Sequence, residues 1–177
     1  MPMGLTFEEE LTRSLEGFRA QLSLPPPNAV FGGFIEGELV ATAAVSRTGP
    51  FPSSHHKMVM WGVFTSPRFR RQGLSRLVVN TALAHAFDSG AMRVNLQVYA
   101  PNEPALTLYQ TIGFVGYGVE ADAVCLDGQY YHGIHMTLVK HRYFGQFQRN
   151  HLGVSKAADP SECHTSASPI EQNTCVS

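Results

Sequence analysis

A short basic turn, residues 67–76 with the sequence PRFRRQGLSR, carries the clearest chemistry of the chain. It lies where a predicted strand ends and a predicted helix begins, and a helix N-terminus offers unpaired N–H groups and a dipole that favours anions. Gly73 lets a ligand approach the backbone closely. Arg70, Arg71 and Arg76 add positive charge, which suits a phosphate or diphosphate group. A helix start with solvated arginines accounts for the same residues.

A second segment with possible chemistry follows the next predicted strand. Residues 94–99 read VNLQVY, and residues 102–114 continue as NEPALTLYQTIGF. Asn102 is typical of a helix cap and Gly113 of a helix end. Tyr109 lies in the helix between them, at a helical spacing that is commonest for a core aromatic.

Taken together, the two segments resemble the acetyl-CoA-binding core of the GNAT superfamily of N-acetyltransferases. In that family a V-x-P-x-x-R-x-x-G-x-G/A segment follows one strand, and an N-x-x-A-x-x-L-Y-x-x-x-G-F segment follows the next. Here Thr65 stands in place of the usual valine and Ser75 in place of glycine or alanine, whereas the second segment matches at every motif position. The resemblance covers residues 29–140.

The resemblance implies acetyl-CoA as co-substrate and no metal. In the family the diphosphate lies on the basic turn, and the pantetheine arm runs beside the preceding strand, where a backbone N–H near Val63 or Phe64 polarises the thioester carbonyl. The family's asparagine, here Asn102, contacts the arm. The expected acetyl-CoA-binding residues are Val63, Phe64, Thr65, Arg70, Arg71, Gln72, Gly73, Leu74, Ser75, Arg76, Asn102, Ala105 and Tyr109.

The resemblance also implies a general acid, whereas the general base is left open. The family's tyrosine at position 109 points at the thioester sulfur and protonates the leaving thiolate. Many relatives carry a carboxylate on the strand before the basic turn, but residues 58–62 (MVMWG) contain none. His55, His56 and Glu120 are the candidates for the base, and the two histidines are favoured as a relay because imidazole titrates near neutrality. Paired histidines at a strand start are more often simply a polar strand end.

The acceptor is less well marked than the acetyl donor. Residues 130–136 (YYHGIHM) resemble a GNAT subgroup that often has an acidic pair where His132 and Gly133 stand, so the acceptor preference of that subgroup does not carry over. The candidates for an acceptor pocket are Met58, Met60, Trp61 and Tyr131, with core packing as the alternative and the commoner use for most of them.

The function predicted from these residues is transfer of an acetyl group from acetyl-CoA to a primary amine of a small molecule or peptide. Direct transfer in a ternary complex is expected, because no cysteine is placed for covalent catalysis. The alternative is a non-catalytic acyl-CoA-binding sensor or regulatory module. A Walker-type nucleotide site is excluded, because no Gly-Lys-Ser/Thr follows the turn.

Length and composition indicate one soluble domain. The chain has 177 residues, of which 44% are hydrophobic, and a formal net charge of −1, so it offers no general attraction for nucleic acid or membranes. Its three cysteines form neither a metal-binding spacing nor an even disulfide set. No signal peptide or apolar run of about 20 residues is present, and a cytoplasmic location is expected.

The predicted elements form a mixed α/β domain in which helices flank a mostly antiparallel sheet. A helix starting at Thr6 precedes strands at residues 30–35, 39–46 and 56–64. Leu74, Leu77, Val78 and Thr81 mark the apolar side of a helix that ends near Gly90. A strand (92–99), a helix (104–113) and two final strands (114–120 and 130–139) complete the order.

Three regions are expected along the chain. Residues 1–28 form a helix and a Pro-rich linker within the domain, residues 29–140 form the core, and residues 141–177 form a largely disordered extension. Aromatic residues at positions 143, 144 and 147 favour a short helix that docks back. The first strand of the resembled fold has no counterpart, which indicates a trimmed chain, a divergent member or an incomplete reading frame. The strand at residues 30–35 would then be an open edge, which predicts lower stability or a homodimer that covers it.

Overall fold

The computed structural model describes residues 12 and 14–151. The expected helix start at Thr6 and residues 152–177 of the expected C-terminal extension lie outside the described residues. The helices and strands follow the predicted order and are α2 (Leu15–Leu22), β1 (Ala29–Ile35), β2 (Glu38–Arg47), β3 (Lys57–Thr65), α3 (Leu74–Asp88), β4 (Arg93–Tyr99), α4 (Glu103–Ile112), β5 (Val115–Leu126), β6 (Gln129–Val139) and α5 (Lys140–His151).

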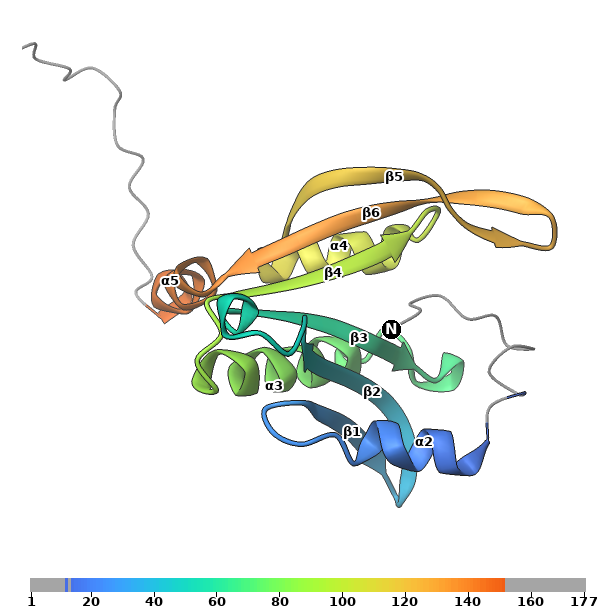
Figure 1. Cartoon of the computed structure of the whole chain (residues 1–177), viewed down its shortest axis with the longest axis horizontal. Helices are drawn as coiled ribbons and strands as arrows, with labels where there is room; N and C mark the ends of the chain where they lie inside the picture. The colour runs from blue at the N-terminus through green and yellow to red at the C-terminus, as the bar shows by residue number, and fades with distance from the viewer. Residues whose placement is uncertain (1–11, 13, 152–177) are drawn as a thin grey trace, which may run out of the picture.

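The described strands form one six-stranded sheet in the order β1-β2-β3-β4-β6-β5. Neighbouring strands are antiparallel except for β3 and β4, which are parallel and connected through α3. Figure 1 shows the sheet with β3 and β4 at its centre. The predicted fold class, a mixed α/β domain with a mostly antiparallel sheet, is confirmed.

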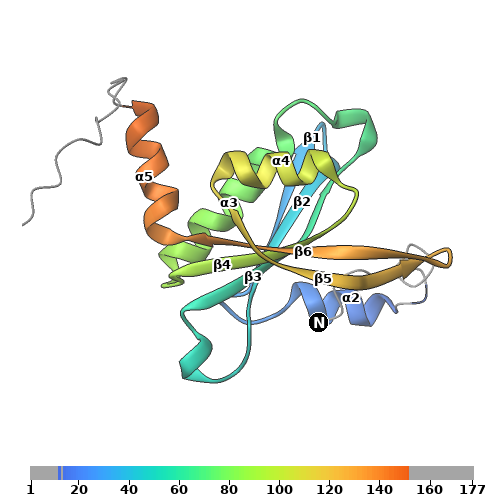
Figure 2. The same ribbon diagram turned by 90° about the horizontal axis from the view of Figure 1, so that it is seen from above.

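The helices cover the two faces of the sheet unequally. Helices α3 and α4 lie on one face and α2 lies on the other (Figure 2). The core fills the first of these layers: Val94, Leu96 and Val98 alternate along β4 and pack in one cluster with Val79 and Leu83 of α3. Because side chains alternate along a strand, the intervening residues of β4 lie on the opposite face, which we call the open face.

Both hairpins, β1–β2 and β5–β6, have tight two-residue turns. Glu36 and Gly37 have φ angles of 50° and 82°, and Asp127 and Gly128 have φ angles of 50° and 75°. Positive φ at two successive residues is the type I′ geometry, whose twist matches that of paired strands. The strand before Asp127 is longer than expected, since β5 runs from Val115 up to the turn.

The apolar side of α3 differs from the prediction. Leu77 is 63% exposed, and the buried face of the helix is formed by Val78, Val79, Ala82, Leu83, Ala86 and Phe87. Most of the helix is apolar, so its periodicity did not distinguish the two sides, and the side was decided by how the helix packs on the sheet.

Helix α5 packs against the end of α3. The Tyr143 ring is buried and lies 5.2 Å from the Phe87 ring, measured between centroids. Its hydroxyl donates to the Asn80 carbonyl at 3.3 Å, and the Lys140 ammonium donates to the Phe87 carbonyl at 2.8 Å. The short docked helix that the aromatic residues predict is therefore present.

Candidate active site

The two central strands separate at their carboxyl ends. β3 and β4 are paired only from Lys57 opposite Arg93 to Val59 opposite Asn95, and beyond that point they diverge (Figure 1). A bulge in β3 contributes to this: two residues, Gly62 and Val63, stand opposite one residue of β2, and Gly62 has a φ of 61°. A bulge adds local twist, so the end of β3 turns away from β4 and leaves backbone groups without a strand partner on that side.

Helix α3 begins next to this separation and has an unblocked N-terminus. Its N-cap is Gly73, with a φ of 81° and no side-chain capping bond. The first helical bond runs from the Leu77 N–H to the Gly73 carbonyl at 3.1 Å, so the N–H groups of Leu74, Ser75 and Arg76 have no partner within the helix. These groups face outward from an exposed turn, which is the arrangement that binds anions.

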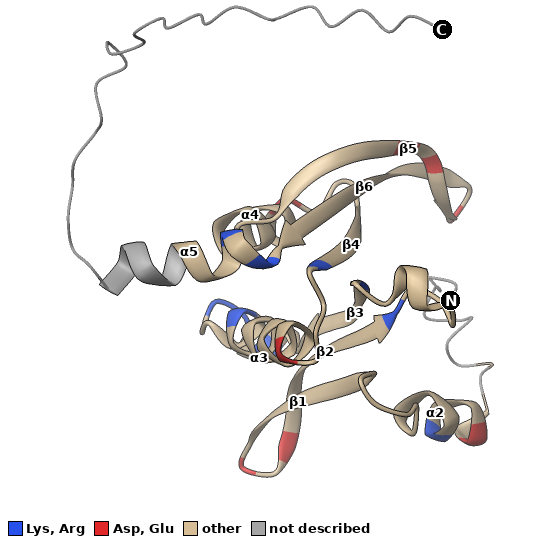
Figure 3. Cartoon of the chain, turned by 60° about the vertical axis from the view of Figure 1, so that its left-hand side comes forward, with Lys and Arg blue, Asp and Glu red and all other residues tan. Residues whose placement is uncertain are grey.

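The arginines of the turn differ in how firmly they are held. Figure 3 shows basic residues gathered at this end of α3. Arg70 donates from Nε to the Thr65 carbonyl at 3.3 Å, and Arg76 donates to the Thr111 hydroxyl of α4 at 2.7 Å. Arg71 is exposed and has a φ of 63°. Arg71 is therefore freer to meet a ligand, while Arg76 also ties α3 to α4.

The two departures from the family motif contact each other. The Thr65 and Ser75 hydroxyls are hydrogen-bonded at 2.7 Å, and Thr65 is buried. The bond joins the end of β3 to the first turn of α3 and closes the basic turn at its base. The sequence alone did not show that the two polar substitutions form a pair.

Tyr109 has a buried ring and an accessible hydroxyl. The residue is 7% exposed, and its ring packs edge-on against Phe114 at 5.6 Å between centroids. Its hydroxyl forms no hydrogen bond with the described residues. Among the described residues, every side-chain nitrogen or oxygen that is fully buried has a hydrogen-bond partner. Because the Tyr109 oxygen has none, it is not fully buried and is open to solvent. Burial raises the pKa of Tyr109 to about 12, and the phenol therefore carries its proton at neutral pH.

Asn102 lies at the start of the helix that carries Tyr109. Its side-chain oxygen accepts from the Ala105 N–H at 3.2 Å, which makes it the N-cap of α4. The side-chain amide N–H groups of Asn102 have no bond to the described residues and can still donate to a ligand.

His55 and His56 lie far from this site. They precede β3, whereas Val63 and Phe64, beside which the thioester is expected, lie near the other end of this strand. With a strand rise of about 3.3 Å per residue, roughly 20 Å separates them from Val63. The His55 ring contacts the Pro50 carbonyl at 3.2 Å. The structure does not bring either histidine to the site, and we carry neither forward as the base.

Glu120, the third candidate for the base, is part of a polar cluster on the open face. Its Oε2 atom accepts from the Gln97 amide at 2.9 Å and contacts His135 Nε2 at 3.1 Å. Continuing the β3–β4 register by two residues brings Gln97 level with Trp61, so the cluster lies where the central strands separate. Gln97 and His135 were missed in the sequence, because only the strand register shows that they meet Glu120.

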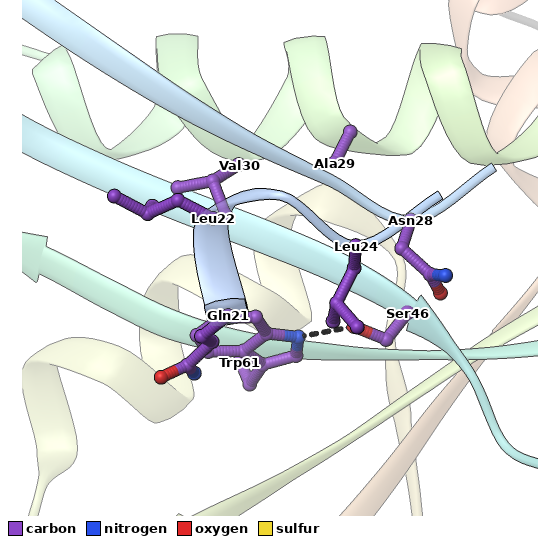
Figure 4. A pocket seen from close by; sticks show the side chains of 8 residues that line it. All are labelled: Gln21, Leu22, Leu24, Asn28, Ala29, Val30, Ser46 and Trp61. Atoms are coloured by element: carbon purple, nitrogen blue, oxygen red, sulfur yellow. Dashed lines mark hydrogen bonds between the residues drawn. The ribbon is translucent and has the colours of Figure 1, made fainter. Parts of the chain in front are cut away.

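A small pocket lies on the same face between α2 and strands β1, β2 and β3. Trp61 and Ser46 line it from the sheet, and Gln21, Leu22 and Leu24 line it from α2 and the segment that follows (Figure 4). The Trp61 indole N–H donates to the Ser46 hydroxyl at 2.7 Å, which holds the ring in place. Trp61 therefore belongs to the open face and not to the core, whereas Met58 and Met60, the other pocket candidates of this strand, are buried in the core.

Two general observations concern the described residues only. No group of three or more His, Cys, Asp or Glu side chains among them is arranged to hold a metal ion. Within residues 12 and 14–151, none of the helices has the length and apolar character that crossing a membrane requires.

The family of the chain follows from comparison with known proteins. Residues 3–114, more than half of the chain, match the model of the acetyltransferase (GNAT) family. The chain belongs to the GNAT acetyltransferases, which places it among the acyltransferase enzymes. The two motifs that carry the resemblance follow β3 and β4, the first leading into α3 and the second forming α4.

One curated relative is the mycothiol acetyltransferase of Paenarthrobacter aurescens, which is 33% identical over 109 residues. The match covers 59% of this chain and 33% of that protein, so the chain spans about a third of the relative's length.

Solved structures support the same fold. An acetyltransferase of the GNAT family from Streptococcus pneumoniae superposes with a TM-score of 0.63 at 23% identity, covering 76% of this chain and 77% of that chain. An acetyltransferase from Salmonella typhimurium, solved with its cofactor acetyl-CoA, superposes with a TM-score of 0.59 at 16% identity, covering 63% and 64%. At these identities the likeness concerns the fold alone.

Proposed function

We propose that this protein transfers an acetyl group from acetyl-CoA to a primary amine of a small molecule or peptide, directly within a ternary complex. The observation that carries the proposal is the separation of β3 from β4 beside the unblocked N-terminus of α3. The Tyr109 hydroxyl, open to solvent and without a partner among the described residues, adds a proton donor at the same end of the sheet.

The residues at this end fit the parts of acetyl-CoA. The free N–H groups of Leu74 to Arg76, together with Arg71, suit the diphosphate. The unpaired backbone of β3 suits the amide-rich arm, which would bind as an added strand next to Val63 and Phe64. Asn102 has donors left for the arm as well. When bound, acetyl-CoA supplies the acetyl group as an activated thioester.

In the proposed reaction the protein stabilises the charge that develops on the thioester carbonyl and supplies a proton to the leaving thiolate. A backbone N–H near Val63 or Phe64 polarises the thioester carbonyl. Tyr109 donates its proton to the thiolate as the carbon–sulfur bond breaks. Direct transfer is favoured because Cys125, the free cysteine of the described residues, lies near the β5–β6 turn and away from β3.

The open face is the proposed approach for the amine. Trp61 and the pocket beside it provide an apolar wall, and Glu120 provides a carboxylate at the level where the strands separate. Two of the structural neighbours are named for a ribosomal-protein alanine and for phosphinothricin as acceptors. Both peptide and small-molecule amines therefore belong in a screen.

Release of free thiol from acetyl-CoA, measured with a panel of amines, tests this function. We expect at least one amine to raise thiol release well above the rate without amine, and mass spectrometry should find the acetylated product. Binding of acetyl-CoA without turnover by any amine would favour the sensor instead.

We also propose that two copies associate through β1. Among the described strands β1 is an edge of the sheet, and Phe34 and Leu39 of the first hairpin are exposed beside it. An exposed edge with apolar side chains favours strand pairing. Sedimentation velocity should show a dimer that Phe34→Lys weakens, whereas a monomer at high concentration would contradict this proposal.

A further inference from the structure

Gly133 of β6 leaves a gap on the open face that a side chain from another strand occupies. A Cβ atom built at this position would collide with the Gln97 amide nitrogen of β4 and would approach the Ala123 Cβ at 2.9 Å. Gly133 has no positive φ in the range that disfavours side chains, so the need for glycine here is steric. The missing side chain allows Gln97 to reach across β6.

The gap at Gly133 allows side chains of three strands to bond one carboxylate, that of Glu120. Gly133 pairs with Tyr99 on one side and with Glu120 on the other, so Glu120 and β4 are separated only by this glycine. Gln97 and His135 both bond Glu120 Oε2, at 2.9 Å and 3.1 Å. The three side chains thus form one connected network across β4, β6 and β5.

The carboxylate determines which nitrogen of His135 is free. An ionised carboxylate only accepts hydrogen bonds, so Nε2 of His135 must be the donor. In the neutral imidazole, Nδ1 then carries the lone pair, and no described residue bonds it. The side chain is 31% exposed, so this lone pair belongs to a ring that solvent and a substrate can reach.

The network and Tyr109 approach the separation of the strands from opposite faces. Tyr109 belongs to the core layer of α3 and α4, and His135 alternates with the core residues Ile134 and Met136, so it lies on the open face. A thioester held between β3 and β4 would have a proton donor on one side and an imidazole on the other.

We propose that His135 is the general base of this enzyme, and that Glu120 and Gln97 are positioning residues that hold its ring through the gap at Gly133. This proposal deepens the proposed function and rests on it. Imidazole is the side chain whose ordinary titration range is best matched to proton transfer at neutral pH.

The protons balance as follows. The substrate ammonium loses one proton to His135 Nδ1, and the neutral amine nitrogen then forms a bond with the acetyl carbon. The nitrogen releases its second proton to solvent as the carbon–sulfur bond breaks and the thiolate takes the Tyr109 proton. The resulting imidazolium is stabilised by Glu120, and solvent returns its proton to the Tyr109 phenolate. The titratable groups that contact His135 are Glu120 and Tyr117 on β5, and Tyr99 on β4 interacts in turn with Glu120.

The first test compares pH–rate profiles of His135→Gln and His132→Gln. His132 is the matched control, because it also contacts a carboxylate of β5, Asp122 at 3.8 Å, but lies on the opposite face of β6. We expect His135→Gln to lower kcat/KM about 10²-fold near neutral pH, with the loss shrinking as pH approaches the pKa of the amine. Acetyl-CoA affinity, measured by calorimetry, should stay unchanged in both variants.

The second test separates positioning from general damage. Gly133→Ala should displace the Gln97 amide and lower kcat with little change in KM, whereas Gly118→Ala adds a methyl group where no atom lies within 4 Å and should be silent. Nitrogen-15 NMR of the imidazole should find the proton of the neutral His135 ring on Nε2, and Glu120→Ala should relax that preference.

The outcomes distinguish this proposal from the function on which it rests. A wild-type protein that binds acetyl-CoA but acetylates no amine overturns both. An active wild type whose pH profile is unchanged by His135→Gln, or whose neutral His135 is protonated on Nδ1, overturns the assignment of the base alone.

Discussion

At the scale of single residues, Tyr109 carries the most direct prediction. Its proton is needed only as the thiolate leaves, so Tyr109→Phe should lower kcat about 10²-fold and change KM little. Because burial raises the pKa of Tyr109 to about 12, the phenol itself should add no limb to the pH–rate profile below about pH 10. Steady-state kinetics across pH would check both points, and wild-type turnover in the Phe variant would assign Tyr109 to packing.

The Thr65–Ser75 pair provides a double-mutant cycle. Thr65→Val leaves the partly buried Ser75 hydroxyl without its hydrogen-bond partner, which should lower the free energy of unfolding by about 1–3 kcal/mol. Thr65→Val with Ser75→Ala together resembles the family motif and removes both polar groups, so it should be close to neutral. Urea denaturation of the two single variants and the double variant measures the coupling energy. Additive losses would show that the 2.7 Å bond contributes nothing.

At the scale of elements, the two ends of α3 give a matched comparison for acetyl-CoA binding. Gly73 and Gly90 have φ angles of 81° and 92°, and an added Cβ meets no atom within 4 Å at either position. Gly73→Asp and Gly90→Asp should therefore strain the backbone alike, but only Gly73→Asp places negative charge where the diphosphate is expected.

Calorimetry should find acetyl-CoA affinity reduced at least tenfold by Gly73→Asp and unchanged by Gly90→Asp. Circular dichroism would establish that both variants are folded. Equal affinity in the two variants would show that the N-terminus of α3 does not bind the diphosphate of acetyl-CoA.

Helix α5 is expected to contribute to the stability of the domain. Tyr143 is buried against Phe87, and truncating a buried aromatic side chain to alanine costs about 3–5 kcal/mol. Tyr143→Ala should lower the melting temperature clearly, whereas Tyr130→Ala, at an exposed position of β6, should change it little. Similar melting temperatures for both variants would mean that α5 adds nothing to the fold.

At the scale of the whole molecule, the same tyrosine should make stability depend on alkaline pH. The folded state holds the Tyr109 proton up to a pKa of about 12, compared with a model value of 10.0, so the unfolded chain releases it first. The contribution of up to about 3 kcal/mol is complete below pH 10 and is lost as pH rises through 12. Burial also raises the pKa values of Tyr99 and Tyr143, so these two tyrosines also make the stability fall as the pH becomes alkaline.

Denaturation in urea between pH 8 and 11.5 measures this loss. Tyr109→Phe should flatten the dependence in part, because the other two tyrosines remain. A variant with the same alkaline slope as the wild type would show that Tyr109 is not protected from ionisation.

Much of the architecture was predictable because it rests on local patterns. The Asp127-Gly128 turn, the Asn102 cap and the end of α4 at Gly113 each follow from the backbone preferences of a few neighbouring residues. The side of α3 that packs on the sheet was not predictable, since Leu77 and Val78 are both apolar and only the packing distinguishes them. The lengths of β5 and α5 likewise depend on partners distant in sequence.

The sequence by itself determined the family, the order of elements and the residues of the two motifs, because these depend on residue types at short spacings. The tertiary structure alone decided which side chains meet. It joined Thr65 to Ser75, placed His55 and His56 at the far end of β3, and gathered Gln97, Glu120 and His135 over Gly133. The physical reason is that strand register and the divergence of β3 from β4 are non-local: each depends on pairing between segments far apart in the chain, and a shift of one residue would move every side chain to the other face.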